Sequence, residues 1–420
     1  MNNLFRKIKK KALPHKTLIQ NFSYLSALQL LSMLMPLITF PYLIKTLGKE
    51  MYGLVIFAQA VISYFQILVS FGFTTSATKE ASINRNNKVK LGEIFGSIFI
   101  AKIILFIISL ILVSIILRFI PKLYGYEWLF FISMWICLYD AVFPLWYFLG
   151  IEKMKYITFL TLISRLISFV LLLLLVKSPE HYLRVPLING IGAIIGAIGS
   201  IIIIINDNKI LLTFPSFLLI KFHFKKSIPY FISELSSNIF INSNKIVLGS
   251  LLGMAEVAYY DLADKITSIF RSVPIGIVRN TIYPRVAQTK NMNIVYKTTI
   301  IMTGFAIISV LLINLTAPLL ITYLGGKEML GGVNALRIFS IAIITAHISN
   351  YYLTVGLWSL DYNIEFRNAM IYTSFIYISI LLLLSIFGWI GLYSLILSII
   401  LVDLFQSFYC FYIYKKIKNH

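Results

Sequence analysis

The sequence predicts an all-α integral membrane protein with about twelve transmembrane helices and both termini in the cytoplasm. Only 13% of its 420 residues are charged and 59% are hydrophobic, so too few polar side chains exist to cover a soluble domain. Apolar runs long enough to cross a hydrocarbon core of about 30 Å as helices recur from Thr17 to Tyr414. The basic residues are concentrated on one side of the resulting topology.

Short polar breaks separate the expected spans, and no break is long enough to hold a soluble domain. The approximate spans are 17–44, 52–76, 93–117, 127–149, 156–176, 183–205, 227–250, 257–284, 296–323, 333–357, 366–386 and 389–414. They define five regions: a basic cytoplasmic N-terminus (1–16), an N-lobe of six spans (17–205), a cytoplasmic inter-lobe loop (206–226), a C-lobe of six spans (227–414) and a cytoplasmic tail (415–420).

The net charge of +21 reflects membrane topology rather than nucleic-acid binding. Of the 37 Lys and Arg residues, 23 fall on the side of the N-terminus and 7 on the opposite side. Because cytoplasmic loops carry the excess of basic residues, both termini are expected in the cytoplasm, and no nucleic-acid partner is expected. The two cysteines, Cys137 and Cys410, lie inside apolar spans, so neither a disulfide nor a metal site is expected.

The two halves of the chain contain a weak internal repeat. LGKEMYGLVIFAQAVISYFQ (47–66) aligns without gaps with LGMAEVAYYDLADKITSIFR (252–271). The identical pairs are Leu47/Leu252, Gly48/Gly253, Ala58/Ala263, Ser63/Ser268 and Phe65/Phe270. Both segments lie at the turn between the first and second spans of their halves, as expected for a transporter with two like-oriented halves around a central site.

Polar residues share one face of several spans. On a helix that turns 100° per residue, the second and seventh spans each carry four polar residues on one face. These are Gln59, Ser63, Gln66 and Ser70, and Glu234, Asn238, Asn242 and Lys245. The repeat partners of the first set include Asp264 and Arg271, so a neutral stripe in one half corresponds to a charged stripe in the other.

Four charges make the eighth span unsuited to lipid on its own. Asp261, Asp264, Lys265 and Arg271 each cost about 2.5–3.5 kcal/mol near a helix centre, or about 10 kcal/mol together. The span therefore needs partner helices, an aqueous cavity or both. Asp261 and Lys265 are four residues apart, so a purely structural ion pair is an open alternative to a role in transport.

The remaining embedded charges allow several interpretations. Arg271 and Lys245 have no acid three or four residues away in their own helices, which favours a role in a cationic cavity. Glu234 and Asp264 suit either a coupling-ion site or a structural counter-charge. A further group lies near the middle of its spans, where an interior position is expected and interhelical pairing is the simpler interpretation. This group is Asp140, Arg165 and Asp403.

Three sets of motifs are similar to those of a known family. The first is Pro36-x4-Pro41-x5-Leu47-Gly48-x3-Tyr52-Gly53 with Gly72 closing the second span, and the second is AVFPLWYFLGIEKMKYI (141–157). The third comprises the turn from Leu252-Gly253 to Tyr259-Tyr260 and the later Tyr283-Pro284-Arg285. Together they resemble bacterial polysaccharide flippases of the Wzx, or O-antigen transporter, type.

This resemblance implies a fold, a cargo and a location. The family belongs to the multidrug/oligosaccharidyl-lipid/polysaccharide exporter superfamily, with the multidrug-and-toxin extruders (MATE) and the lipid II flippase. It implies two MATE-like lobes, alternating access, and an undecaprenyl-diphosphate-linked oligosaccharide, an O-antigen or capsule repeat unit, as cargo. The implied location is the bacterial inner (cytoplasmic) membrane, among membrane lipids, with H⁺ or Na⁺ as coupling ion. Contact with the polysaccharide polymerase machinery is left open.

Under the resemblance, the embedded polar residues have expected roles. Arg271, Lys245 and Lys265 are expected to bind the diphosphate through charge-assisted hydrogen bonds. The glycan hydroxyls are expected to contact Gln59, Gln66, Asn238 and Asn242. The coupling ion is expected at Glu234, Asp264 or Asp261. The first two spans hold no embedded charge, which departs from the cationic central cavity of the family.

Two other functions fit less well. A MATE-type antiporter of drugs or cations should carry uncompensated acid, especially in its first helix, whereas the embedded charges here are seven basic and five acidic. A membrane-embedded glycan-modifying enzyme should place catalytic residues in a sizeable external loop, and the external loops are short. No Gly-x4-Gly-Lys-Ser/Thr loop is present, so a nucleotide cofactor is not expected and a transporter is favoured over an enzyme.

Overall fold

The computed structural model describes the backbone of residues 2–208 and 215–418 and most side chains from Tyr24 onward, and every regular element in these ranges is helical. Residue 1, residues 209–214 and residues 419–420 lie outside these ranges and belong to the predicted N-terminus, inter-lobe loop and tail.

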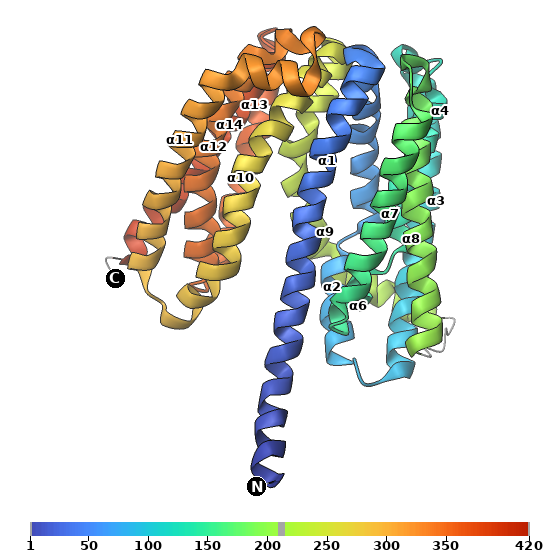
Figure 1. Cartoon of the computed structure of the whole chain (residues 1–420), viewed down its shortest axis with the longest axis vertical. Coiled ribbons are helices and arrows are strands. Elements are labelled where there is room, and N and C mark those ends of the chain that lie inside the picture. The colour runs from blue at the N-terminus through green and yellow to red at the C-terminus, as the bar shows by residue number, and fades with distance from the viewer. Residues whose placement is uncertain (1, 209–214, 419–420) are drawn as a thin grey trace. The chain divides into compact units, whose positions relative to one another are not determined.

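Long helices dominate the described ranges, and Figure 1 shows their order along the chain. They are α1 (Asn2–Ser70), α2 (Phe73–Ile83), α3 (Lys88–Phe119), α4 (Glu127–Ser133), α5 (Trp135–Val142), α6 (Leu145–Gly150), α7 (Met154–Leu175), α8 (Arg184–Asn208), α9 (Phe217–Leu251), α10 (Met254–Thr289), α11 (Met292–Gly325), α12 (Val333–Asn350), α13 (Asn363–Ile386) and α14 (Leu392–Lys418). Short 3₁₀ helices occur at η1 (Pro121–Leu123), η2 (Pro179–Leu183) and η3 (Lys327–Gly332), and a π-helical segment, η4, at Tyr351–Trp358.

The helices form two compact units. The first comprises Met1–Tyr42 and Val61–Leu235, and the second comprises Leu43–Ala60 and Ser236–His420. In the first unit α7 and α8 lie side by side, and in the second α12 lies beside both α11 and α14 (Figure 1). Small residues allow this contact: a Cβ atom on Gly192 of α8 would lie 2.1 Å from Ser168 Oγ of α7.

The structure supports the membrane assignment. Nine candidate spans are found within the described residues: Ile38–Ile83 overlaps two of the twelve predicted spans, and each of the other eight overlaps one, which leaves 227–250 and 257–284 without a counterpart. The predicted span 257–284 is helical in α10 but is not among the nine, because its charged residues interrupt the apolar sequence. The helices that do qualify expose apolar side chains, such as Ile108, Ile111 and Ile115 of α3, which suits contact with lipid.

The aligned glycines of the internal repeat have similar backbone conformations. Gly48 interrupts α1 with φ 72° and ψ 167°, and Gly253 precedes α10 with φ 132° and ψ 171°. Positive φ values favour glycine, because a side chain would clash with the backbone there. The repeat thus marks two turns of the same kind, each of which begins a long helix that carries predicted site residues.

Candidate functional site

The charges predicted on the seventh and eighth spans form a cluster around Asp261 in the second unit. The Asp261 side chain, on α10, is 1% exposed. Its Oδ1 accepts a hydrogen bond from Lys245 Nζ of α9 at 2.8 Å, and its Oδ2 accepts one from Lys265 Nζ at 2.6 Å. Lys265 lies four residues after Asp261 on the same helix, so the predicted Asp261–Lys265 pair is formed.

Tyr52 supplies a third donor to Asp261. Its hydroxyl donates to Asp261 Oδ2 at 2.6 Å and accepts a hydrogen bond from Lys265 Nζ at 2.7 Å. The neighbouring Gly53 makes this possible, because a Cβ atom there would lie 1.8 Å from the carbonyl oxygen of Met254. Sequence reasoning missed Tyr52 as a site residue, although it belongs to the Tyr52-Gly53 motif.

Arg271 and Lys245 are both paired with acids that lie outside the three- or four-residue spacing within their own helices. Arg271 Nη2 donates to Asp264 Oδ1 at 2.7 Å, and Lys245 Nζ lies 3.6 Å from Asp264 Oδ2. Asp264 precedes Arg271 by seven residues on α10, whereas Lys245 lies on α9 and its acidic partners lie on α10. The role of Arg271 and Lys245 in a cationic cavity stays a prediction.

The direct ion pairs of the cluster join three cations to two acids. Lys245, Lys265 and Arg271 face Asp261 and Asp264, and each of these side chains is less than one-third exposed. A third acid, Asp403 of α14, also interacts electrostatically with Arg271. Arg271 also retains donor capacity, since its Nε is buried without a hydrogen-bond partner among the described residues. Its guanidinium lies 5.3 Å from the Phe339 ring centroid, which holds it in place by a cation–π contact.

The predicted glycan-contacting residues of the second unit are half-buried polar side chains. Gln59 lies on the part of α1 that belongs to this unit, and Asn238 and Asn242 lie one turn apart on α9. Asn242 Nδ2 is 3.5 Å from Asn238 Oδ1, a long hydrogen bond. These side chains have the polarity and the partial exposure that contact with a sugar requires.

The other two predicted site residues, Gln66 and Glu234, lie in the first unit. Gln66 Nε2 donates to Asp140 Oδ2 at 3.4 Å, and Glu234 Oε2 accepts a hydrogen bond from Ser70 Oγ at 3.3 Å. Asp140 pairs with Lys102 of α3 at 2.6 Å, so the interhelical pairing expected for Asp140 is present. The first unit therefore has a polar cluster of its own.

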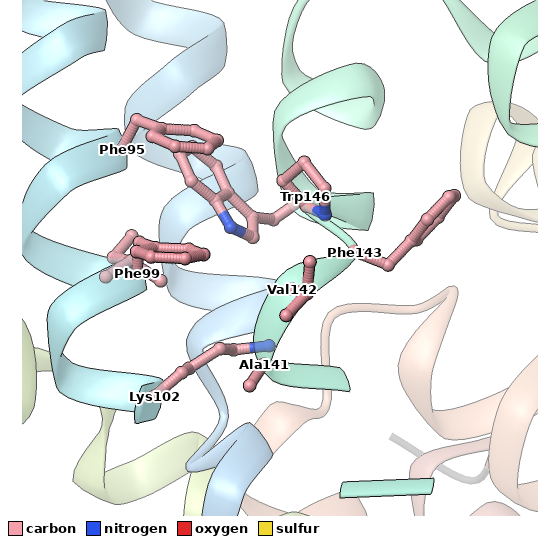
Figure 2. A pocket seen from close by; sticks show the side chains of 9 residues that line it. Phe95, Phe99, Lys102, Ala141, Val142, Phe143 and Trp146 are labelled. Carbon is pink, nitrogen blue, oxygen red and sulfur yellow. The ribbon is translucent and has the colours of Figure 1, made fainter. Parts of the chain in front are cut away.

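Lys102 stabilises a break in the fourth predicted span. α5 ends at Val142 and α6 begins at Leu145, and Pro144 has no N–H with which to bond the carbonyl oxygen of Asp140 four residues earlier. Lys102 Nζ donates to that carbonyl oxygen at 2.9 Å. Figure 2 shows Lys102 extending from α3 toward the segment of Ala141 and Val142. One lysine thus satisfies both the carboxylate and the freed carbonyl group of Asp140.

Side chains nearly fill the space beside the break that Figure 2 shows. Phe95, Phe99 and Trp146 are among the residues around a gap of only about 10 Å³, which is too small for a cargo group. No group of three or more His, Cys, Asp or Glu side chains suited to hold a metal ion occurs within the searched, described residues. The charged clusters are consequently the main candidates for binding.

Long apolar helices with buried charges define a multi-pass membrane protein, and solved structures share this helical fold. The chain is similar to "Lipid II flippase MurJ, inward closed conformation", with a TM-score of 0.75 and 16% identity over 93% of this chain and 87% of the other. It is also similar to an inward-facing multidrug resistance MATE family transporter of the MOP superfamily, with a TM-score of 0.71 and 13% identity over 91% and 94%. The predicted MATE-like helical fold is confirmed, while the count of twelve spans and the side of the termini stay predictions.

Sequence comparison identifies the family. The profile described as "Polysaccharide biosynthesis protein" matches residues 18–290, and the chain belongs to this family. Two relatives share the name "Putative O-antigen transporter". One, from Escherichia coli (strain K12), is 26% identical over 361 residues, 84% of this chain and 87% of the relative. The other, from Shigella dysenteriae, is 27% identical over 300 residues, 70% of this chain and 74% of the relative.

These findings confirm the resemblance and three predictions made with it. The chain is a transporter of the polysaccharide biosynthesis family rather than an enzyme. It is a multi-pass membrane protein, and its bacterial relatives agree with the inner membrane as its location. The family match ends at residue 290 and therefore includes the whole charge cluster around Asp261.

Proposed function

We propose that this protein is a flippase for an undecaprenyl-diphosphate-linked oligosaccharide, an O-antigen or capsule repeat unit, which it moves from the cytoplasmic to the periplasmic leaflet. The family and the names of the two relatives support this class of cargo. The observation that carries the proposal is the unpartnered Nε of Arg271 in a cluster that gathers three cationic side chains. Cationic donors of this kind suit an anionic group such as a diphosphate.

The three parts of such a cargo need different surroundings. The polyprenyl tail can stay in lipid, whereas the diphosphate and the glycan cannot cross hydrocarbon unaided. In the proposed mechanism Arg271 binds diphosphate oxygens first, because it has donors to spare, and Lys245 and Lys265 join by partly exchanging Asp261 for the cargo. The glycan hydroxyls would contact a set of polar side chains as alternating access exposes the headgroup to the periplasm. This set is Gln59, Gln66, Asn238 and Asn242.

Membrane energetics favour outward movement of this cargo. Each elementary charge that crosses the potential changes the free energy by about 2.3 kcal/mol per 100 mV, and an inside-negative potential drives an anion outward. We propose that inward flow of H⁺ or Na⁺ resets the protein. Asp264 is the best-placed acid for this step, because it is 21% exposed and pairs with Arg271, whereas three donors already hold Asp261. Glu234 is the candidate in the first unit.

Transport of a fluorescent undecaprenyl-diphosphate oligosaccharide in proteoliposomes, with and without H⁺ or Na⁺ gradients, tests this function. We expect Arg271→Gln to lower the rate at least tenfold, because a lost charge-assisted hydrogen bond weakens binding by about that factor. Arg271→Lys keeps the charge and should retain an intermediate rate. Arg285→Gln removes an exposed charge from the same helix and should behave like the wild type.

Two outcomes would contradict the proposal. One is a wild-type rate for a correctly inserted Arg271→Gln protein. The other is gradient-driven uptake of a cationic drug without any transport of the lipid-linked glycan, which would favour the antiporter. The pairing of Asp261 and Asp264 with cationic side chains speaks against a cationic substrate, because neither acid is uncompensated.

A further inference from the structure

A cavity of about 160 Å³ lies in the first unit, next to the break between α5 and α6. Its charged lining residues are Lys102 of α3, Asp140 of α5 and Arg165 of α7, and its lining also includes Thr74 and Thr161. About 10–15 Å³ of such space is enough to hold one water molecule, so the cavity has room for a polar group larger than a single water. Its lining shares Lys102 and Phe143 with the nearly filled gap in Figure 2.

The break between α5 and α6 favours a ligand-binding role for this cavity. Non-helical backbone at membrane depth is tolerated where it is buried in protein or lines a polar cavity, and interrupted helices are where transporters bind substrates. Phe143 and Leu145, at the two ends of the break, both line the cavity. The break is therefore stabilised by Lys102 and borders the cavity that Lys102 also lines.

Among the charged residues that line this cavity, Arg165 is the one without an ion-pair partner in the described part of the chain. Both carboxylate oxygens of Asp140 are engaged, Oδ1 by Lys102 at 2.6 Å and Oδ2 by Gln66 at 3.4 Å. Arg165 forms no ion pair with any described acidic side chain. Glu234, the other acid of this polar cluster, does not line the cavity. An arginine in the middle of a span is costly, so its retention without an acidic partner calls for a function.

We propose that this cavity is an oxyanion-binding site of the first unit, in which Arg165 receives the oxygens of a lipid-borne phosphate group. The guanidinium is planar and always charged, and its fork of donors matches phosphate oxygens in pairs. Thr74 and Thr161 place hydroxyl groups in the same lining, and the Tyr139 and Thr161 hydroxyls are hydrogen-bonded to each other. The cavity is smaller than the sites that enclose drug-sized molecules, so it fits a phosphate group and not an oligosaccharide.

Two lipids could present this chemistry. As a step in transport, the proposal rests on the proposed function: the cargo diphosphate would contact Arg165 in the first unit, as it contacts Arg271 in the second. The alternative source is the phosphate of an ordinary bilayer lipid. Either source uses Arg165 in the same way, and a competition experiment distinguishes them.

The test measures binding of inorganic pyrophosphate to the full-length protein in a neutral maltoside detergent by calorimetry. Arg271→Gln serves as the parent, so that the second unit contributes less to the signal. Adding Arg165→Gln should weaken pyrophosphate binding at least tenfold, whereas Arg165→Lys should lie between the two. Arg118→Gln, a change at an exposed arginine of the same unit, should leave the affinity unchanged. The melting temperature of each variant shows whether it is folded.

Three results decide the proposal. If the folded Arg165→Gln protein keeps the parent affinity, or if the parent binds no pyrophosphate, the site assignment is overturned. If Arg165-dependent binding is found, competition by undecaprenyl diphosphate but not phosphatidylglycerol assigns the site to cargo, and competition by both assigns it to lipid phosphate in general. If this binding persists while proteoliposomes transport no lipid-linked glycan, the anion site stands and the proposed function fails.

Discussion

The two units hold their buried charges in different ways. In the second unit three cations and two acids lie on the adjoining helices α9 and α10, and Asp261 is the shared partner of both lysines. In the first unit Lys102, Asp140 and Arg165 come from three different helices, and only Lys102 and Asp140 pair with each other. The second unit holds its buried charges in a cluster around a central acid. The first unit holds a local ion pair, with an arginine that lines a cavity beside it.

This difference shows how many structural partners each charged side chain has. Asp261 binds two lysines at once, so both lysines depend on this carboxylate. Lys102 instead serves one acid and the backbone at a helix break. Two arginines keep capacity for a ligand in their pairing: Arg271 has an unpartnered Nε beside its bond to Asp264, and Arg165 lines a cavity.

The largest loss of stability is expected from Asp261→Asn. It leaves Lys245 and Lys265 without their shared carboxylate, and removing one partner of a buried ion pair costs about 3–5 kcal/mol. A large fall in the melting temperature of the detergent-purified protein is expected. Asp361→Asn makes the same change in an exposed ion pair, with Lys290, and should have little effect. Equal stability of the two variants would show that Asp261 is not the centre of the cluster.

The first unit is tested by Lys102→Met. This change removes two hydrogen bonds to Asp140, each of a kind that contributes about 1.5–3 kcal/mol. Pro144→Ala restores an N–H that can bond the carbonyl oxygen of Asp140, so Lys102→Met should cost less in that background. Thermal unfolding of the four proteins of this double-mutant cycle measures the coupling. Purely additive effects would contradict the role of Lys102 at the break.

A smaller effect is expected from Gly53→Ala. The added Cβ would lie 1.8 Å from the carbonyl oxygen of Met254, and overpacking of this kind costs about 1–3 kcal/mol. It should also move Tyr52 away from Asp261. Gly304→Ala in α11 is the matched control, since nothing lies within 4 Å of its Cβ position and alanine favours the helix by about 1 kcal/mol. The prediction fails if the two melting temperatures change in the same direction by similar amounts.

The smallest expected effect is that of Tyr52→Phe. It removes only the hydroxyl that bridges Asp261 and Lys265, a loss of about 1 kcal/mol. Transport of the lipid-linked glycan should fall less than in Arg271→Gln, because both lysines keep their bonds to Asp261. Tyr412→Phe, at an exposed position, provides the baseline for stability and transport. A Tyr52→Phe effect as large as that of Asp261→Asn would move the centre of the cluster to Tyr52.

The sequence by itself determined the features that depend on the order of residues along one helix or one turn. Apolar runs predicted the helical membrane fold, and motifs such as Tyr52-Gly53 indicated the family. The repeat located Gly48 and Gly253, which both adopt positive φ. The charged stripe of α10 was visible because a helical period places Asp264 and Arg271 on one face.

Tertiary structure decided which charges of different helices meet, and the side-chain conformations decided the pairing within α10 beyond Asp261 and Lys265. The spacing of α10 did not show that Asp264 holds Arg271, that Lys245 of α9 reaches Asp261, or that Tyr52 completes the group. Lys102 and Arg165 were single charges in separate spans, and their positions around one cavity depend on how α3, α5 and α7 pack. The physical reason is that periodicity describes one helix at a time, whereas buried charges are stabilised by groups that other helices bring within hydrogen-bonding distance.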